Sequence, residues 1–143
     1  MKSLRFTFAV ITVVFVASSC SFSPRTLDAP RTVALDREFE LRIGEEAKLG
    51  NGRVNVKFVA LVNDSRCPGD VTCIQEGNAE IELLVSGDEG EKRLSLNTSR
   101  NMTHDERYGL YRISLTQLVP YPRTDRPVRD EDYGATLVIT QGS

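Results

Sequence analysis

Apolar and polar residues alternate from Ala79 to Ser86, with Leu84 as the one exception, so that Ile81, Leu83 and Val85 would share one face of a strand. A period of two residues is that of a β-strand with one buried face. The same alternation recurs in six other short segments, at residues 39–43, 47–49, 53–62, 94–96, 111–115 and 135–139. No helical period accompanies it. The pattern therefore predicts an all-β domain, a small antiparallel β-sandwich of immunoglobulin-like or similar type, with a small β-barrel as the alternative.

Two polar stretches interrupt this pattern and are expected to be loops. Residues 98–109 contain His104, the only histidine, and residues 120–132 contain three prolines among mixed charges. Loops of this length in a small domain are usually functional or disordered. Within the long segment 53–62, Val59 and Leu61 are apolar on the second face as well, so we expect this half of the strand to be covered on both sides.

The N-terminus has the three-part layout of an export signal. Lys2 and Arg5 give a positive start, residues 6–16 form an apolar run too short to span a bilayer, and small residues precede Cys20. The sequence ASSC resembles the bacterial lipobox. The resemblance implies cleavage before Cys20, diacylglycerol on its thiol and a further acyl chain such as palmitate on its amine, which together anchor a protein stably. An ordinary secretory signal or a retained anchor is the alternative.

These features divide the chain into a signal peptide (1–19), a lipidated cysteine with a flexible tether (20–37) and a single all-β domain (38–143). The tether is expected because residues 21–37 are polar, include Pro24 and Pro30 and show no periodic apolar pattern. Ser21, not aspartate, follows Cys20. In a bacterium with two membranes this resembles an outer-membrane address facing the periplasm; with one membrane, we expect the outer face of the plasma membrane.

The lipid assignment leaves Cys67 and Cys73 as one pair among the three cysteines. An oxidising compartment favours a disulfide between them. Pro68 and Gly69 suit a type II turn, so the disulfide would close a hairpin loop as a structural staple. A redox-active pair is less favoured because the spacing is not that of a Cys-x-x-Cys motif. Zinc is equally disfavoured, because His104 is the only further nitrogen or sulfur ligand of this kind.

A longer motif surrounds these cysteines: Asp64-Ser65-Arg66-Cys67-Pro68, then Cys73, then Gly77-Asn78-Ala79 leading into the alternating strand. It resembles a group of uncharacterised bacterial secreted proteins and lipoproteins. Weaker similarity includes Ile43-Gly44-Glu45, Tyr121-Pro122 and Asp132-Tyr133. The group typically has tryptophan where Gln75 stands in this chain. The resemblance implies an exported all-β domain and implies no known activity.

Charged residues near the cysteines are candidate contacts for a partner. Arg66 either pairs with a nearby carboxylate, beside an Asx-type bond from Asp64, or presents its planar guanidinium to a partner. The candidate partner contacts are Arg66, Asp70, Gln75, Arg123 and Arg126. A calcium site from Asp64 and Asp70, or from residues 130–132, would lack the regular ligand spacing of known loops, so no metal and no cofactor are predicted. Tyr133 is expected to pack at a corner of the sheet.

The residue content disfavours two functional classes. The predicted mature chain carries 16 basic and 20 acidic residues, because Lys2 and Arg5 leave with the signal, and the charges are interspersed, which disfavours nucleic-acid binding. His104, with Asp105 and Glu106, has no nucleophile or oxyanion motif beside it, so no enzyme is predicted. The first hypothesis is a lipoprotein with a non-catalytic binding or envelope-structural domain that contacts an envelope protein. The second is a periplasmic inhibitor that presents the loop 67–73 to a hydrolase.

Overall fold

The computed structural model describes residues 30–142, which contain nine β-strands and one short 3-10 helix. The strands are β1 (Arg31–Val33), β2 (Glu38–Arg42), β3 (Glu46–Leu49), β4 (Val54–Asp64), β5 (Ala79–Gly87), β6 (Gly90–Asn97), β7 (Asp105–Tyr108), β8 (Tyr111–Val119) and β9 (Gly134–Gln141). The helix η1 (Asp130–Asp132) lies just before β9. The seven strands expected from the alternation are all present.

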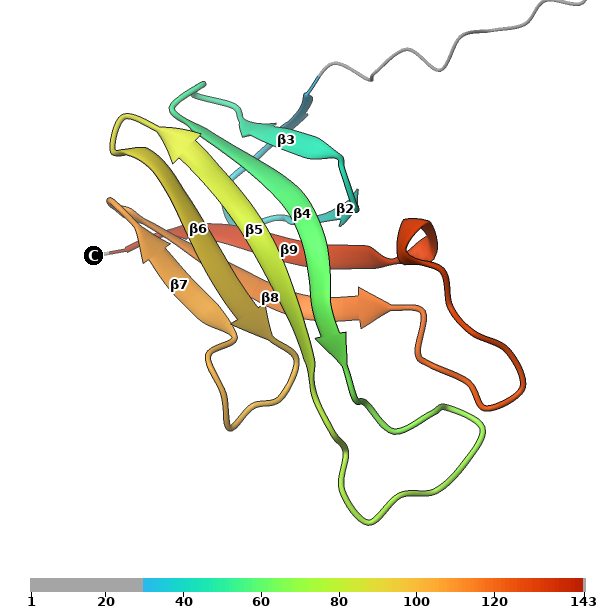
Figure 1. The fold of residues 1–143 in the computed structure, drawn as a ribbon. Coiled ribbons are helices and arrows are strands. Elements are labelled where there is room, and N and C mark those ends of the chain that lie inside the picture. The colour runs from blue at the N-terminus through green and yellow to red at the C-terminus, as the bar shows by residue number, and fades with distance from the viewer. Residues whose placement is uncertain (1–29, 143) are drawn as a thin grey trace, which may run out of the picture.

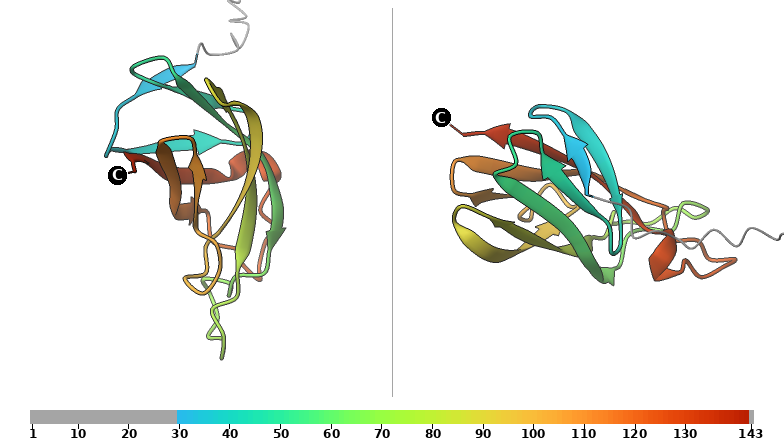
Figure 2. Two further views of the ribbon diagram at one scale, coloured as in Figure 1. Left: turned by 90° about the vertical axis from the view of Figure 1, so that its left-hand side faces the viewer. Right: turned by 90° about the horizontal axis from the view of Figure 1, so that it is seen from above.

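The strands form two sheets that pack face to face as a β-sandwich (Figures 1 and 2). One sheet has the order β1-β3-β4-β5-β6 and the other has the order β2-β9-β8-β7. All strand pairs are antiparallel except β1 with β3. The predicted sandwich is confirmed, and the barrel alternative is wrong because each sheet keeps two edges. Strands β3 to β6 follow one another across their sheet, unlike the ABED order of immunoglobulin constant domains.

The core lies between the two sheets and is built by the alternating residues that the sequence singled out. Ile81, Leu83 and Val85 of β5 are buried, with 0% exposure each. Ile113 on β8 and Leu137 on β9 pack into the core from the opposite sheet. Because successive residues of a strand point to opposite faces, one buried face per sheet is enough to fill this layer.

The N-terminal boundary of the folded domain differs from the prediction. Residues 31–33, assigned to the tether, form β1 and pair in parallel with β3, with Val33 opposite Leu49. Val33 is buried against the core, and Asp36 donates its backbone N–H to Ile139 at 2.9 Å. The boundary at residue 37 is therefore too late. The apolar residues between Arg31 and Arg37 are consecutive, at 33–35, so they show no alternation.

The predicted loop 98–109 is also partly wrong, because its last part forms β7. Only Tyr108 of this strand is buried, and its hydroxyl donates a hydrogen bond to the carbonyl of Gly90. At this edge Lys92 of β6 bonds to Glu106 and to the carbonyl of Arg107, which links the two sheets. A charged edge strand with one buried residue gives no alternating signal.

The second half of β4 was expected to be covered on both faces, and this is wrong. The pairing of β4 with β5 shifts between Phe58 and Ala60 and again between Leu61 and Asn63. Such β-bulges change which face a side chain occupies. Val62 is consequently 55% exposed, and β3 pairs with β4 only as far as Lys57.

The longest connections lie toward one end of the sandwich, which we call the loop end. They are the cysteine loop (residues 65–78) between β4 and β5, residues 98–104 between β6 and β7, and the proline loop (residues 120–133) between β8 and β9. Figures 1 and 2 show β1 at the opposite end. Cys20 and the predicted signal and lipobox lie outside the described residues. No helix within residues 30–142 has the length and hydrophobicity needed to cross a bilayer.

Candidate functional site at the loop end

The cysteine loop is closed by the predicted disulfide, which joins Cys67 to Cys73 with a Cα–Cα distance of 5.9 Å. The base of the loop continues the pairing of β4 with β5. Ser65 donates its backbone N–H to the carbonyl of Asn78 at 2.7 Å, and Cys67 donates to Glu76 at 2.8 Å. The loop therefore extends the hairpin beyond the sandwich and closes it covalently near its tip.

Arg66 does not face a partner, contrary to one of the two expectations for it. Its side chain is 4% exposed and forms an ion pair with Asp64, with Nη2 and Oδ2 2.7 Å apart. The guanidinium also donates to the carbonyl of Leu118 at 2.5 Å and to that of Pro120 at 2.8 Å. A buried guanidinium needs this full set of acceptors, and here they come from its own chain. Arg66 as a partner contact is wrong, and its pairing with a nearby carboxylate is confirmed.

Asp64 joins the start of the cysteine loop to the end of the proline loop. Its Oδ1 accepts the backbone N–H of Arg66 at 3.1 Å, which is the expected Asx-type bond. Its Oδ2 accepts a hydrogen bond of 2.9 Å from the hydroxyl of Tyr133. Burial alone would raise the pKa of Asp64, but the hydrogen bonds and charge of Arg66, with the Tyr133 hydroxyl, outweigh it and lower the pKa below 3.8.

Tyr133 is buried at the corner where β9 begins, as expected. Burial and the hydrogen bond to the Asp64 carboxylate raise the pKa of Tyr133 to about 12. Tyr121 completes this cluster, because the guanidinium carbon of Arg66 lies 4.6 Å from the centre of its ring. We call Asp64, Arg66, Tyr121 and Tyr133 the arginine clamp. It holds the bases of the cysteine loop and the proline loop together.

Two further contacts join these loops nearer their tips. Gly69 donates its backbone N–H to the carbonyl of Pro122 at 2.9 Å. The carboxylate of Asp70 accepts the backbone N–H of Thr124 at 3.1 Å and also its hydroxyl. These hydrogen bonds lower the pKa of Asp70, even though it is exposed. Asp70, predicted to contact a partner, is thus exposed and bonded within the chain.

The glycine of the Gly77-Asn78-Ala79 run has a steric role at the base of the cysteine loop. Gly77 has φ +71°, and a Cβ at this position would lie 1.9 Å from the carbonyl oxygen of Ser65. Any other residue would collide with backbone. Asn78 bonds to the side chain of Asn97 at 2.7 Å, which connects the cysteine loop to the end of β6.

The remaining predicted contacts are exposed, and two apolar residues join them. Gln75, Arg123 and Arg126 are all exposed. The sequence prediction did not include Val71, which is 47% exposed, or Ile74, which is completely exposed at the tip of the cysteine loop. The signal for both was present, because they are apolar residues inside a polar turn where no strand alternation requires them.

A hollow of about 300 Å³ lies beside the arginine clamp on the proline loop. Tyr121, Pro127 and Val128 form its apolar lining, and Arg123 and Arg126 lie at it. Arg123 is occupied by a two-point contact with Asp125, at 2.8 and 2.9 Å. Arg126 is at this hollow and makes no ion pair within residues 30–142.

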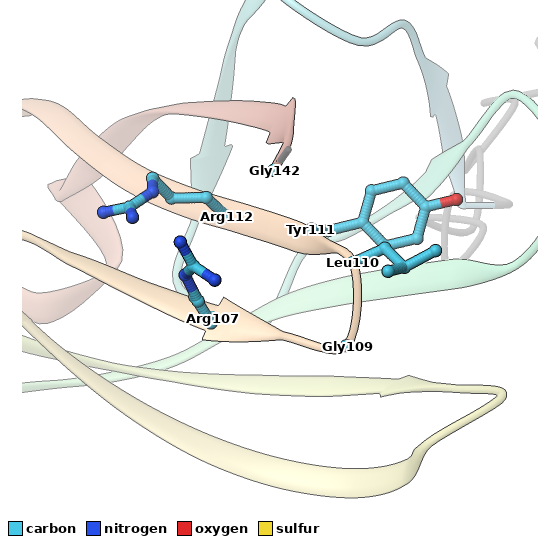
Figure 3. Close-up of a pocket in the computed structure, with 6 residues that line it drawn as sticks. All are labelled: Arg107, Gly109, Leu110, Tyr111, Arg112 and Gly142. Atoms are coloured by element: carbon cyan, nitrogen blue, oxygen red, sulfur yellow. The ribbon is translucent and has the colours of Figure 1, made fainter.

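A second, smaller hollow of about 80 Å³ lies away from the loop end, beside the turn between β7 and β8. Figure 3 shows the side chains of Arg107 and Arg112 on the two neighbouring strands, with Leu110 and Tyr111 nearer the turn. Arg112 forms an ion pair with Asp105. None of the predicted contact residues lines this hollow.

His104 and the acidic residues of the proline loop do not form a common site. His104 is exposed, and its Nδ1 lies 3.4 Å from the carbonyl of Met102. Asp132 and Glu131 pair with Arg129. Within residues 30–142, no three His, Cys, Asp or Glu side chains gather in a way that could hold a metal ion.

Comparison of this chain with protein-family models, with curated proteins and with solved structures finds no significant match.

Proposed function

We propose that this protein is a lipid-anchored envelope lipoprotein whose β-sandwich binds another envelope protein through the loop end, without catalysis. The observation that carries the proposal is Ile74, a completely exposed aliphatic side chain on a loop closed by a disulfide and tied at its base. A large apolar side chain that is exposed to water has a higher free energy than the same side chain when it is buried. A partner that covers Ile74 removes this cost.

The distribution of exposed apolar residues supports the same surface. Of the six large apolar side chains that are exposed within residues 30–142, Leu110 alone lies in the turn between β7 and β8. The other five lie in the three loops of the loop end or in the half of β4 that leads to it: Val62, Val71, Ile74, Met102 and Tyr121. Exposed apolar side chains that gather in one region mark interaction surfaces.

The hydrogen bonds beneath this surface make it suitable for binding. Arg66 fixes the base of the cysteine loop to two carbonyls of β8 and the proline loop, and Asp70 fixes its tip to Thr124. A loop that is already ordered loses less conformational entropy when it binds. Because Arg66 and Asp64 form an ion pair with each other, we assign the arginine clamp a positioning role and no role in proton transfer.

The anchor suits this orientation. β1 lies at the end opposite the loop end (Figure 1). Residues 20–29, ten residues in all, connect the predicted lipid on Cys20 to Pro30 and β1. An extended chain of this length reaches at most about 35 Å. A lipid on Cys20 would then keep the domain within this distance of the membrane, attached at the end opposite the loop end.

An inhibitor of an envelope hydrolase is the second candidate. The specific observation in its favour is that Ile74, which is completely exposed, directly follows the disulfide that closes residues 67–73. The soluble chain with Cys20→Ser would be tested against a panel of proteases and peptidoglycan hydrolases. Inhibition that Ile74→Asp abolishes and His104→Ala leaves intact supports this candidate; turnover of a substrate that His104→Ala abolishes would instead contradict the non-catalytic proposal.

The binding proposal is tested by affinity purification of cross-linked complexes from intact cells that express the full chain. We expect Ile74→Asp to remove the cross-linked partner and Leu110→Asp, a matched change at an exposed residue outside the loop end, to retain it. Loss of the partner in both variants, or in neither, would contradict the assignment of the surface. The anchor is tested separately, because Cys20→Ser should release the protein from the membrane fraction.

A further inference from the structure

The hollow on the proline loop has, beside an apolar lining, an arginine that makes no ion pair within residues 30–142. Three charged side chains line it. Arg123 pairs with Asp125, and Asp132 pairs with Arg129 at an Nε–Oδ2 distance of 3.0 Å; Arg129 also pairs with Glu131. Arg126 is the third, and it makes no ion pair within residues 30–142. The hollow therefore presents one exposed guanidinium, and the planar shape of this group suits a carboxylate.

The apolar part of the hollow is fixed in position by the arginine clamp. Tyr121 receives the guanidinium of Arg66 over its ring and is still 55% exposed. Its neighbour Pro120 is held by the hydrogen bond from Arg66 to its carbonyl. Pro127 and Val128 complete the lining. A flat ring with prolines beside it offers a surface for an apolar side chain, and the volume of about 300 Å³ is at the lower end of ligand sites.

We propose that this hollow binds an acidic side chain of the partner protein, an aspartate or glutamate that is adjacent in sequence to an aromatic or aliphatic residue. The carboxylate pairs with the guanidinium of Arg126, and the neighbouring apolar side chain packs on Tyr121 and Pro127. This inference rests on the proposed function, since it names the chemistry of the partner that the loop end contacts.

The position of the hollow makes one partner able to contact both features. The proline loop that forms the hollow is bonded to the cysteine loop through Gly69 with Pro122 and through Asp70 with Thr124. Ile74 lies four residues beyond Asp70 in the cysteine loop. A partner surface that receives Ile74 in an apolar depression would thus carry its acidic residue beside that depression.

The test is titration of the full chain with Cys20→Ser by two capped dipeptides of matched shape, N-acetyl-Phe-Glu-amide and N-acetyl-Phe-Gln-amide, followed by backbone amide NMR shifts. We expect saturable shifts at Tyr121, Thr124 and Val128, with binding of the glutamate peptide about tenfold tighter, because an ionised acceptor forms the stronger hydrogen bond with a guanidinium. Arg126→Gln should remove this preference, and Arg100→Gln, a matched change at another exposed arginine, should preserve it.

Three results would overturn the proposal: no saturable shifts at the hollow, equal binding of the two peptides, or an unchanged preference in Arg126→Gln. If N-acetyl-Phe-Gln with a free C-terminal carboxylate binds more tightly than N-acetyl-Phe-Glu-amide, the assignment to an acidic side chain is overturned. The outcome is separable from that of the proposed function. Peptide binding with no cross-linked partner at Ile74 would refute the partner surface alone, and a partner without peptide binding would refute the hollow alone.

Discussion

The hydroxyl of Tyr133 donates a hydrogen bond of 2.9 Å to Oδ2 of Asp64, a residue that precedes it by 69 positions in the chain. The same carboxylate oxygen accepts Nη2 of Arg66 at 2.7 Å. The beginning of β9 and the beginning of the cysteine loop are thus joined through one carboxylate. The stability of the loop end should therefore depend on the protonation of these groups.

Tyr133→Phe should change how stability depends on alkaline pH. The folded pKa of Tyr133 is raised to about 12, so its neutral form contributes stability that is fully present below the ordinary pKa of about 10 and is lost as the pH rises toward 12. Urea unfolding at several pH values between about 9 and 11 would measure this. The loss of unfolding free energy over that range should be smaller in Tyr133→Phe; identical slopes in the two proteins would contradict the raised pKa of Tyr133.

Arg66→Ala should destabilise the fold by about 3–5 kcal/mol, because it leaves Asp64 as a buried charge without its partner. The side chains of Arg66 and Asp64 are only 4% and 7% exposed. Chemical denaturation would measure the change. Arg100→Ala, at an exposed arginine between β6 and β7, should change stability by less than about 0.5 kcal/mol. Similar values for the two variants would show that Arg66 is a surface residue.

Gly77→Ala should cost more stability than Gly90→Ala, although both glycines have positive φ. At Gly90 a Cβ meets nothing within 4 Å, so alanine costs only the left-handed conformation, about 1 kcal/mol. At Gly77 the Cβ would also collide with the carbonyl of Ser65, at 1.9 Å. We expect the difference between the two unfolding free energies to exceed about 2 kcal/mol. A difference near zero would mean that the cysteine loop shifts without cost.

The disulfide should stabilise the folded state without being required for it. The loop closed by Cys67 and Cys73 is short, and its closure contributes about 2 kcal/mol in the chain-entropy model. The variant with both residues changed to serine should unfold at lower denaturant concentration and keep the β-sheet circular dichroism signal. In the exported wild type, the intact mass without reduction should fall below the dithiol value by two hydrogens; free thiols would contradict the staple.

The sandwich was predictable because its interior strands have one buried face. In β5, Ile81, Leu83 and Val85 all point into the core, and the alternation of apolar and polar residues in the sequence shows this directly. The edge strands β2 and β6 also bury alternating residues and were predicted, whereas the edge strands β1 and β7 do not. β1 and β7 each bury a single residue, Val33 and Tyr108, so their pairing depends on neighbours that are distant in the sequence.

The candidate site was predictable in its location but not in the direction of its side chains. The pairing of Cys67 with Cys73 and the Asx-type bond of Asp64 are local, and both are confirmed. The direction of the Arg66 side chain could not be predicted, because its acceptors at Leu118 and Pro120 are 52 and 54 residues away in the sequence. A local motif does not show whether an arginine meets a partner or its own chain, and only the packing of β8 against the cysteine loop decides between them.

We propose that the tip of the cysteine loop touches a partner protein in the envelope. The most direct measurement is photo-cross-linking in intact cells with a photoreactive amino acid in place of Ile74 and, separately, in place of Leu110 in the turn between β7 and β8. We predict one discrete cross-linked species from position 74 that is absent from position 110. No species from position 74, or the same species from both positions, would contradict the claim.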